Sequence, residues 1–198
     1  MNYFTADLHL GSNEILYREN RPFCDINTFT KYFISICNSQ TKPDDTIWVL
    51  GDFINYNAQH KLSYSEIVDI FLIIQQINAK VVLIIGNGEE RIIDNCFNSS
   101  FSEFKNFCIR LGFFDAQIDT VLQINNKLFY LNHFPHKHKD GFINLFGHTH
   151  RATGLWKPYG LNVGCDLNHF FLFSENEIFR LLEMKEKYWD KDKDVLCI

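Results

Sequence analysis

The 198-residue sequence lacks several features that mark special classes of protein. It has no apolar run long enough to span a bilayer, and its first residues read directly as a strand instead of a charged and apolar leader. We therefore expect neither a membrane protein nor a secreted one. It also has no internal repeat and no linker rich in glycine, serine or proline. The sequence predicts a single domain over residues 1–198, with a charged, frayed tail from about residue 185.

The six cysteines form no CxxC pair, and several of them lie within apolar runs. This placement is typical of reduced thiols that act as small hydrophobic side chains. It argues against a disulfide framework or a zinc ribbon. We therefore expect a cytoplasmic protein. The formal net charge is −5, and a mildly acidic surface argues against non-specific binding to nucleic acids or anionic membranes, since such binding needs a basic patch.

The composition is that of a globular protein, with 46% hydrophobic residues and 20 phenylalanines. In the first half, strands expected at 2–6, 46–50 and 80–85 alternate with helices at about 27–40, 63–78 and 89–97, which predicts a parallel sheet. A further helix is expected at 100–112. The second half contains a hairpin over 116–131, short strands at 143–146, 161–163 and 170–173, and a last helix from Ser174 to about Tyr188. Together the halves predict an α/β (α+β) fold in which two sheets pack face to face with helices outside.

Side chains that can bind metal ions follow five of the predicted strands. The run Leu145-Phe146-Gly147 ends in His148-Thr149-His150. Because side chains two positions apart on an extended segment point to the same side, His148 and His150 can share one site. The same kind of ending recurs after four earlier apolar runs. The complete set of candidate ligands is Asp7, His9, Asp52, Asn87, His133, His148 and His150.

This set mixes carboxylate, amide and imidazole groups and contains no cysteine. Such oxygen and nitrogen donors suit divalent ions such as Mn²⁺, Fe²⁺, Zn²⁺ or Ni²⁺. Seven ligands are too many for one tetrahedral ion but suit two ions that share a bridging carboxylate. Two ions about 3.5–4 Å apart can bind both oxygens of a phosphate and ionise a shared water at neutral pH.

The ordered motifs resemble those of the calcineurin-like metallophosphoesterase superfamily, and Arg21-Pro22-Phe23 and residues 161–166 resemble its small bacterial and phage branch. The resemblance implies a four-layer αββα sandwich of two mixed β-sheets flanked by helices. It also implies two divalent ions, Mn²⁺ first among them, and catalytic roles for Asp52, Asn87 and His133. The implied ligands are Asp7, His9 and His150 for one ion, Asn87, His133 and His148 for the other, and Asp52 as the bridge.

The implied activity is hydrolysis of a phosphoester by a metal-bridging hydroxide that attacks phosphorus in line. We favour phosphodiesters, possibly nucleotides or cyclic nucleotides, over monoesters. One position departs from the family pattern, because Gly88 stands where a histidine usually lies near the leaving group. Either the leaving group needs little protonation, or another residue substitutes; the candidates are His136, His138, Glu89 and Arg91.

Residues expected to contact the substrate are Asn55, Arg21, His136 and His138, with Arg18 near the first metal site. Arginine suits phosphate because its guanidinium donates two parallel hydrogen bonds. His60 and His169 are interpreted as structural. The alternative function is an inactive protein of the same fold that serves as an interaction scaffold, which the change at Gly88 keeps open.

Overall fold

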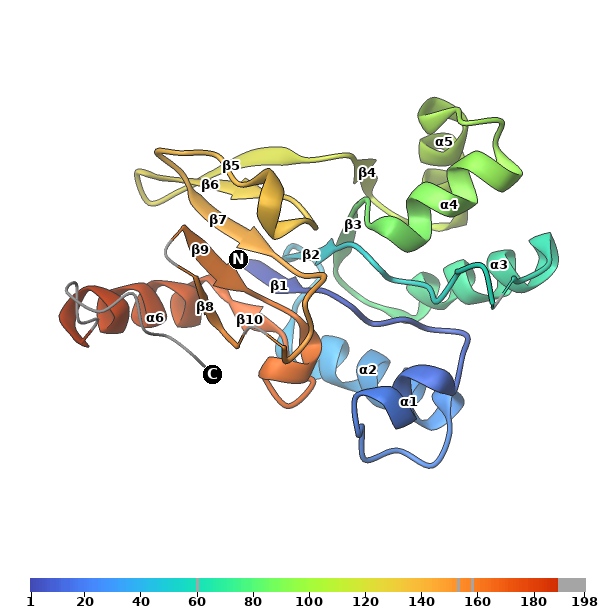
Figure 1. Ribbon diagram of the computed structural model, residues 1–198, viewed down its shortest axis with the longest axis horizontal. Coiled ribbons are helices and arrows are strands. Elements are labelled where there is room, and N and C mark those ends of the chain that lie inside the picture. Colours follow the sequence, from blue (N-terminus) through green and yellow to red (C-terminus); the bar gives the residue numbers. More distant parts are fainter. Residues whose placement is uncertain (60, 153, 158, 189–198) are drawn as a thin grey trace.

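The computed structural model describes residues 1–59, 61–152, 154–157 and 159–188, and its strands form two five-stranded sheets (Figure 1). The first sheet has the order β10-β1-β2-β3-β4. The strands β1 (Asn2–Thr5), β2 (Thr46–Leu50), β3 (Lys80–Ile84) and β4 (Asp115–Gln117) are parallel, and β10 (Phe173–Ser174) pairs antiparallel with β1. The carboxyl ends of β1, β2 and β3 therefore lie at one edge of the sheet.

The second sheet has the order β5-β6-β7-β9-β8. The strands β5 (Thr120–Ile124) and β6 (Lys127–Leu131) form an antiparallel hairpin, and β6, β7 (Ile143–Phe146) and β9 (Gly160–Asn162) run parallel. A short strand, β8 (Trp156–Lys157), pairs antiparallel with β9 at the edge. Both sheets are therefore mixed, as predicted.

The two faces of the first sheet belong to two separate hydrophobic clusters. Successive residues of a strand point to opposite faces, and Tyr3 and Phe4 accordingly join different clusters. One cluster fills the space between the sheets and includes Phe4, Leu50, Ile84, Phe129, Leu131 and Leu145. The other cluster lies between the first sheet and the helices. Burial on both faces explains why β3 is almost entirely aliphatic.

The helices are distributed unevenly over the two clusters. Five of them pack on the helical side of the first sheet: α1 (Glu14–Arg18), α2 (Ile26–Gln40), α3 (Tyr64–Phe71), α4 (Asn87–Cys96) and α5 (Phe101–Leu111). The last helix, α6 (Glu175–Tyr188), instead contributes Ile178 and Leu182 to the cluster between the sheets. It lies at the opposite end of Figure 1 from α3, α4 and α5. Across the described ranges, no helix combines the length and apolar character needed to span a membrane.

Three short 3₁₀ segments complete the elements: η1 (Leu72–Gln76), η2 (Pro135–Lys137) and η3 (Cys165–Leu167). The predicted capping box at Ser63 is present, because the Ser63 hydroxyl accepts from the Glu66 N–H and the Glu66 carboxylate accepts from the Ser63 N–H. Such reciprocal bonds satisfy amide groups that have no partner within the helix. The α+β sandwich of two mixed sheets with flanking helices is thus confirmed.

Several boundaries differ from the prediction. The first strand of the hairpin expected over 116–131, residues 116–124, forms two strands in different sheets. β4 pairs with β3, whereas β5 pairs with β6. The strand expected at 170–173 shrinks to β10, since Phe170 has a left-handed backbone with φ 68°. The tail is helical up to Tyr188, and residues 189–198 and His60 lie outside the described residues. The five described cysteines are free thiols, and Cys197 is outside that range.

Candidate metal site and cleft

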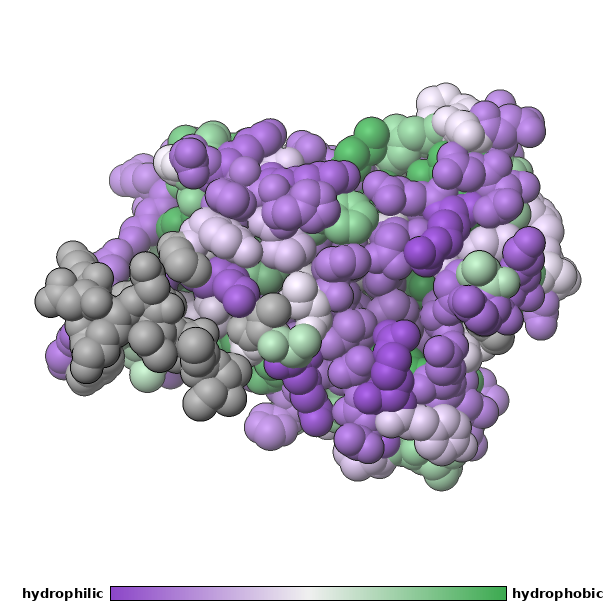
Figure 2. Space-filling model, viewed as in Figure 1, coloured by the Kyte–Doolittle hydropathy of each residue, from purple (hydrophilic) through white to green (hydrophobic). Residues whose placement is uncertain are grey.

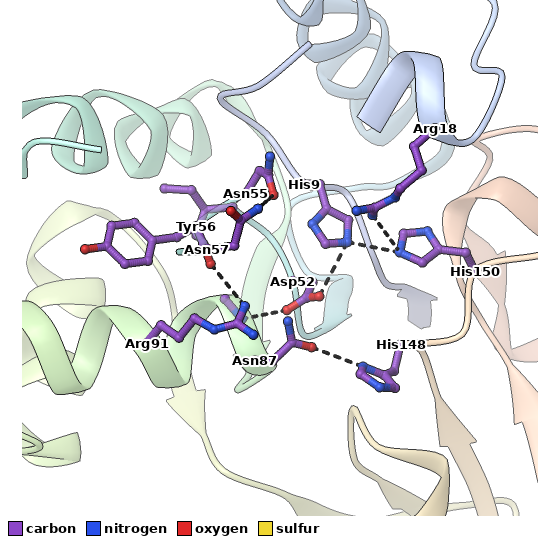
Figure 3. A pocket seen from close by; sticks show the side chains of 12 residues that line it. His9, Arg18, Asp52, Asn55, Tyr56, Asn57, Asn87, Arg91, His148 and His150 are labelled. Carbon is purple, nitrogen blue, oxygen red and sulfur yellow. Dashed lines mark hydrogen bonds and ion pairs between the residues drawn. The ribbon is translucent and has the colours of Figure 1, made fainter. Parts of the chain in front are cut away.

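The seven candidate ligands meet at the edge where five strands end. Asp7 and His9 follow β1, Asp52 follows β2, and Asn87 follows β3 in the first sheet; His133 follows β6, and His148 and His150 follow β7 in the second. Figure 3 shows that His9, Asp52, Asn87, His148 and His150 lie around one cleft. The parallel arrangement explains the convergence, because parallel strands present their carboxyl ends at a common edge.

The first group of donors comprises Asp7, His9 and His150, whose ligand atoms all lie within 4.8 Å of one another. The Nε2 atoms of His9 and His150 are 3.2 Å apart. Two ring nitrogens at this distance can bind one cation. The Oδ2 atom of Asp7 is buried and has no hydrogen-bond partner. Since buried polar atoms are nearly always paired, this unpaired oxygen fits the role of a cation ligand.

The second group comprises Asn87, His133 and His148. Asn87 Oδ1 lies 3.1 Å from His133 Nε2 and 3.0 Å from His148 Nδ1, and these two nitrogens are 3.2 Å apart. The other ring nitrogen of His133 donates to the carbonyl oxygen of Leu50 at 2.8 Å. That bond fixes the tautomer in which Nε2 keeps its lone pair for the site.

Asp52 lies between the two groups. Its Oδ2 atom is 3.4 Å from His9 Nε2 and 3.7 Å from His133 Nε2. Its other oxygen accepts a hydrogen bond of 2.8 Å from the Gly88 N–H. Asp52 is therefore the group in the described site that is placed to contact two cations at once, and the donor types of both groups suit divalent ions.

Five of the seven candidates have a left-handed backbone, which is uncommon for residues other than glycine. The φ angles are 60° at Asp7, 51° at His9, 52° at Asp52, 72° at His148 and 46° at His150. Such conformations cost about 1–3 kcal/mol each and cluster at functional sites. The chain bends sharply after each of these strands, so that the side chains converge at the sheet edge.

The charges of the site are set by burial and by the neighbouring groups. Burial lowers the pKa of His9 to about 3, so its ring is neutral and can offer a lone pair at physiological pH. Burial would raise the pKa of Asp52, but His133 and His9 outweigh it, and the pKa lies below its ordinary value. Burial raises the pKa of Asp7. A cation would compensate the cost of holding these carboxylates charged in the interior.

A buried carboxylate supports the site from behind. Glu89 is fully buried; its Oε2 accepts from the N–H groups of Asp52 and Gly86, each at 2.9 Å, and its Oε1 accepts from Phe53 at 3.0 Å and Ile54 at 3.4 Å. Burial, and then the charge of Asp52, raise the pKa of Glu89 to about 7. Glu89 does not line the cleft, so it is not placed to protonate a leaving group.

The cleft in front of the ligands has a volume of about 360 Å³. Asn55, a predicted substrate contact, lines it together with Gly88 and three residues that were not predicted, Ile54, Tyr56 and Asn57. Arg18 and Arg91 lie on opposite sides of Asp52 and His9 (Figure 3). The visible face of the molecule is mostly hydrophilic, and its hydrophobic residues form small separate areas (Figure 2). Because Arg18 and Arg91 line the cleft, it suits a small, polar, negatively charged ligand.

Three residues predicted to contact the substrate lie elsewhere. His138 stacks on Tyr159, with ring centroids 4.2 Å apart, and His136 packs near Phe134. Neither lines the cleft. Arg21 is 4% exposed, and within the described residues its hydrogen bonds go to internal acceptors, so it does not reach the cleft. For these three side chains the geometry does not support the predicted substrate contact.

Comparison with known protein families and with curated proteins finds no match. Among solved structures, a protein of unknown function from Aquifex aeolicus is similar, with a TM-score of 0.62 and 18% identity, over 91% of this chain and 98% of the other. YfcE, a phosphoesterase from E. coli, gives a TM-score of 0.43 and 16% identity, over 82% of this chain and 77% of its own. The first of these shows that the fold occurs in a protein of nearly the same extent.

Proposed function

We propose that this protein is a phosphoester hydrolase that uses two divalent metal ions. The observation that carries the proposal is the place of Asp52 Oδ2 between the two donor groups. The first ion would be held by Asp7, His9 and His150, the second by Asn87, His133 and His148, and both by Asp52. The resemblance of the ordered motifs to the calcineurin-like metallophosphoesterases supports the same assignment.

When bound, two such ions supply positive charge to the phosphoryl oxygens and lower the pKa of water to about 7. The protein's own groups bind and orient the substrate. Arg18 and Arg91 flank the ligands, and guanidinium groups suit phosphate oxygens on either side of the phosphorus. The Asn55 side chain adds an amide to the wall of the same cleft. Asp52, which is buried and charged, lies between the two donor groups and so sets the spacing between them.

The substrate class follows from what the described wall of the cleft contains. Apart from the candidate ligands, its ionisable side chains are Arg18, Arg91 and Tyr56. Burial raises the pKa of Tyr56, which makes it a weaker acid, and guanidinium groups do not release a proton in proteins, so the wall offers no good proton donor among these three side chains. We infer that the leaving group departs as an anion stabilised by Arg91. Aryl phosphodiesters, and nucleotides cleaved between two phosphate groups, meet this requirement better than simple alkyl esters. Cyclic nucleotides release a ribose oxygen and therefore depend more strongly on Arg91.

The test combines metal analysis with a substrate panel. Purified protein is analysed for bound metals and is then assayed with Mn²⁺, Fe²⁺, Zn²⁺ and Ni²⁺ on monoesters, linear diesters and cyclic nucleotides. We expect two metal equivalents per chain and hydrolysis of an aryl phosphodiester. Asp52→Asn should abolish this hydrolysis, whereas Asp69→Asn on the exposed face of α3 should not. Metal-loaded protein that hydrolyses no ester would favour the scaffold function, and an active Asp52→Asn variant would contradict the proposed role of Asp52.

A further inference from the structure

Arg21 is buried beside the candidate metal site without facing the cleft. Its guanidinium lies 4.9 Å from the ring centroid of Phe29 and 5.9 Å from that of Phe170. All its described hydrogen bonds are internal. Nη2 donates to the carbonyl oxygen of Asp7 at 2.7 Å, and Nη1 donates to that of Leu8 at 2.8 Å. Arg21 therefore holds the backbone of the loop that carries Asp7 and His9.

The same guanidinium binds Asp166 through two parallel bonds. Nε donates to Oδ1 and Nη2 to Oδ2, each at 2.8 Å. Asp166 is also buried, and its Oδ2 lies 3.2 Å from His150 Nδ1. A continuous chain of contacts thus runs from Asp7 through Arg21 and Asp166 to His150. Its two ends are members of the same donor group.

The hydrogen bond between His150 Nδ1 and Asp166 decides which ring nitrogen of His150 can bind a metal ion. A carboxylate only accepts hydrogen bonds, so Nδ1 donates to Asp166 and Nε2 keeps its lone pair. That lone pair faces His9 Nε2 at 3.2 Å. The backbone of His150 is held separately, because Asn162 Nδ2 donates to its carbonyl oxygen at 2.9 Å. The contact with Asp166 therefore concerns the ring alone.

We propose that Arg21 and Asp166 are a positioning pair, which fixes the tautomer and orientation of His150 and holds this ring in register with the Asp7 loop for metal binding. The proposal rests on the metal-dependent function proposed above. Buried ion pairs generally stabilise folds no better than apolar residues of similar size. The charges are therefore explained by orientation, in the way that carboxylates commonly orient metal-binding histidines.

The test compares three variants with the parent protein, using Mn²⁺ as the probe. The double variant Arg21→Met with Asp166→Leu removes both charges together and avoids leaving either one unpaired. Asp166→Asn keeps the shape of the side chain and removes its charge, and it replaces the double variant in the test if that variant does not fold. Glu14→Gln is the control, because Glu14 is an exposed acidic residue of α1 outside the groups of residues that could hold a metal ion. Calorimetry gives the affinity and number of Mn²⁺ ions.

Loss of the pair should weaken one of the two Mn²⁺ equivalents by about 10–100-fold. Glu14→Gln should leave both nearly unchanged. Nitrogen-15 NMR of the metal-free protein, at a pH where the ring is neutral, should show the proton of His150 on Nδ1 in the parent and redistributed to Nε2 in the double variant. A folded variant with unchanged tautomer and unchanged affinity would overturn the proposal, and so would a control that loses Mn²⁺ equally.

The two proposals fail in different ways. If the parent protein binds no Mn²⁺ or other divalent ion, the proposed function is wrong. The tautomer of His150 still decides the role of Arg21 and Asp166 in that case, because it is measured without metal. If the parent binds two ions and the variants bind them equally well, the metal site stands and the positioning pair does not.

Discussion

Glu89 Oε2 accepts a hydrogen bond of 2.9 Å from the backbone N–H of Asp52, so a carboxylate buried behind the candidate site holds the loop that carries the proposed bridging residue. The same oxygen accepts from Gly86, just before Asn87. One side chain thereby sets the spacing between the ends of β2 and β3. This spacing decides whether Asp52 and Asn87 can reach a common ion.

Glu89→Gln should destabilise the protein, because an amide cannot replace the carboxylate here. One oxygen would remain, and the new NH₂ group would face N–H donors that it cannot accept from. Each buried donor left unsatisfied costs roughly 1–3 kcal/mol. Urea unfolding should show this loss in the metal-free protein. Glu90→Gln, on the exposed side of the same helix, is the control and should unfold like the parent.

Gly88→Ala should also destabilise the protein, although alanine normally favours a helix. A Cβ atom at position 88 would lie 2.8 Å from the carbonyl oxygen of Ile54 and 3.4 Å from Asp52 Oδ1. Overpacking of this kind costs about 1–3 kcal/mol, which exceeds the gain of up to about 1 kcal/mol from helix propensity. A raised melting temperature would show that the contact relaxes. The same contact limits any attempt to supply a proton donor by Gly88→His.

Arg91→Met should slow hydrolysis most for esters with poor leaving groups. Its guanidinium lines the cleft and makes one long hydrogen bond, 3.4 Å to the carbonyl oxygen of Tyr56. A charged hydrogen bond contributes about 1.5–3 kcal/mol, so kcat/KM should fall by about 10–100-fold. The measurement is a series of diesters of graded leaving-group pKa. An equal loss across the series would assign Arg91 to binding only, and Arg110→Met on α5 is the control.

The ion pair of Arg21 and Asp166 should make stability sensitive to acid. Burial would raise the pKa of Asp166, but hydrogen bonds from His150 and Arg21 outweigh it and lower the pKa to about 2. A carboxyl with a depressed pKa stabilises the fold above its unfolded pKa of about 3.9 and loses this contribution as the pH falls through 2. The loss amounts to roughly 2–3 kcal/mol.

Chemical unfolding of the metal-free protein between about pH 4 and pH 2 measures this dependence. Asp166→Asn should be less stable than the parent at pH 5 and should show a flatter decline below pH 4. If both proteins lose stability in parallel over this interval, Asp166 is not the group that titrates.

The convergence of the candidate ligands could be predicted from the sequence because the signal at each position is local. An apolar run that stops at Asp7, Asp52 or His133 identifies both the strand and the residue at its end. The parallel order then brings these ends together. For the same reason the sheets and most helices were predicted correctly, whereas the break between β4 and β5 depends on partners far along the chain.

The supporting contacts could not be predicted in this way. Arg21 and Asp166 are 145 positions apart, and neither residue type identifies its partner. Arginine near a phosphate site is usually interpreted as a substrate contact, and only the burial of Arg21 corrects this. Likewise, the sequence places Glu89 beside Asn87 but does not reveal the amide groups of Asp52 and Phe53 that it binds.

The division of the donors between the two sheets has a consequence for assembly. Every candidate ligand contributed by the first sheet precedes residue 88, and every candidate from the second follows residue 132. A nascent or partly folded chain with one sheet formed would offer at most a fragment of each coordination shell. Metal binding would then follow the docking of the two sheets and would stabilise the folded structure.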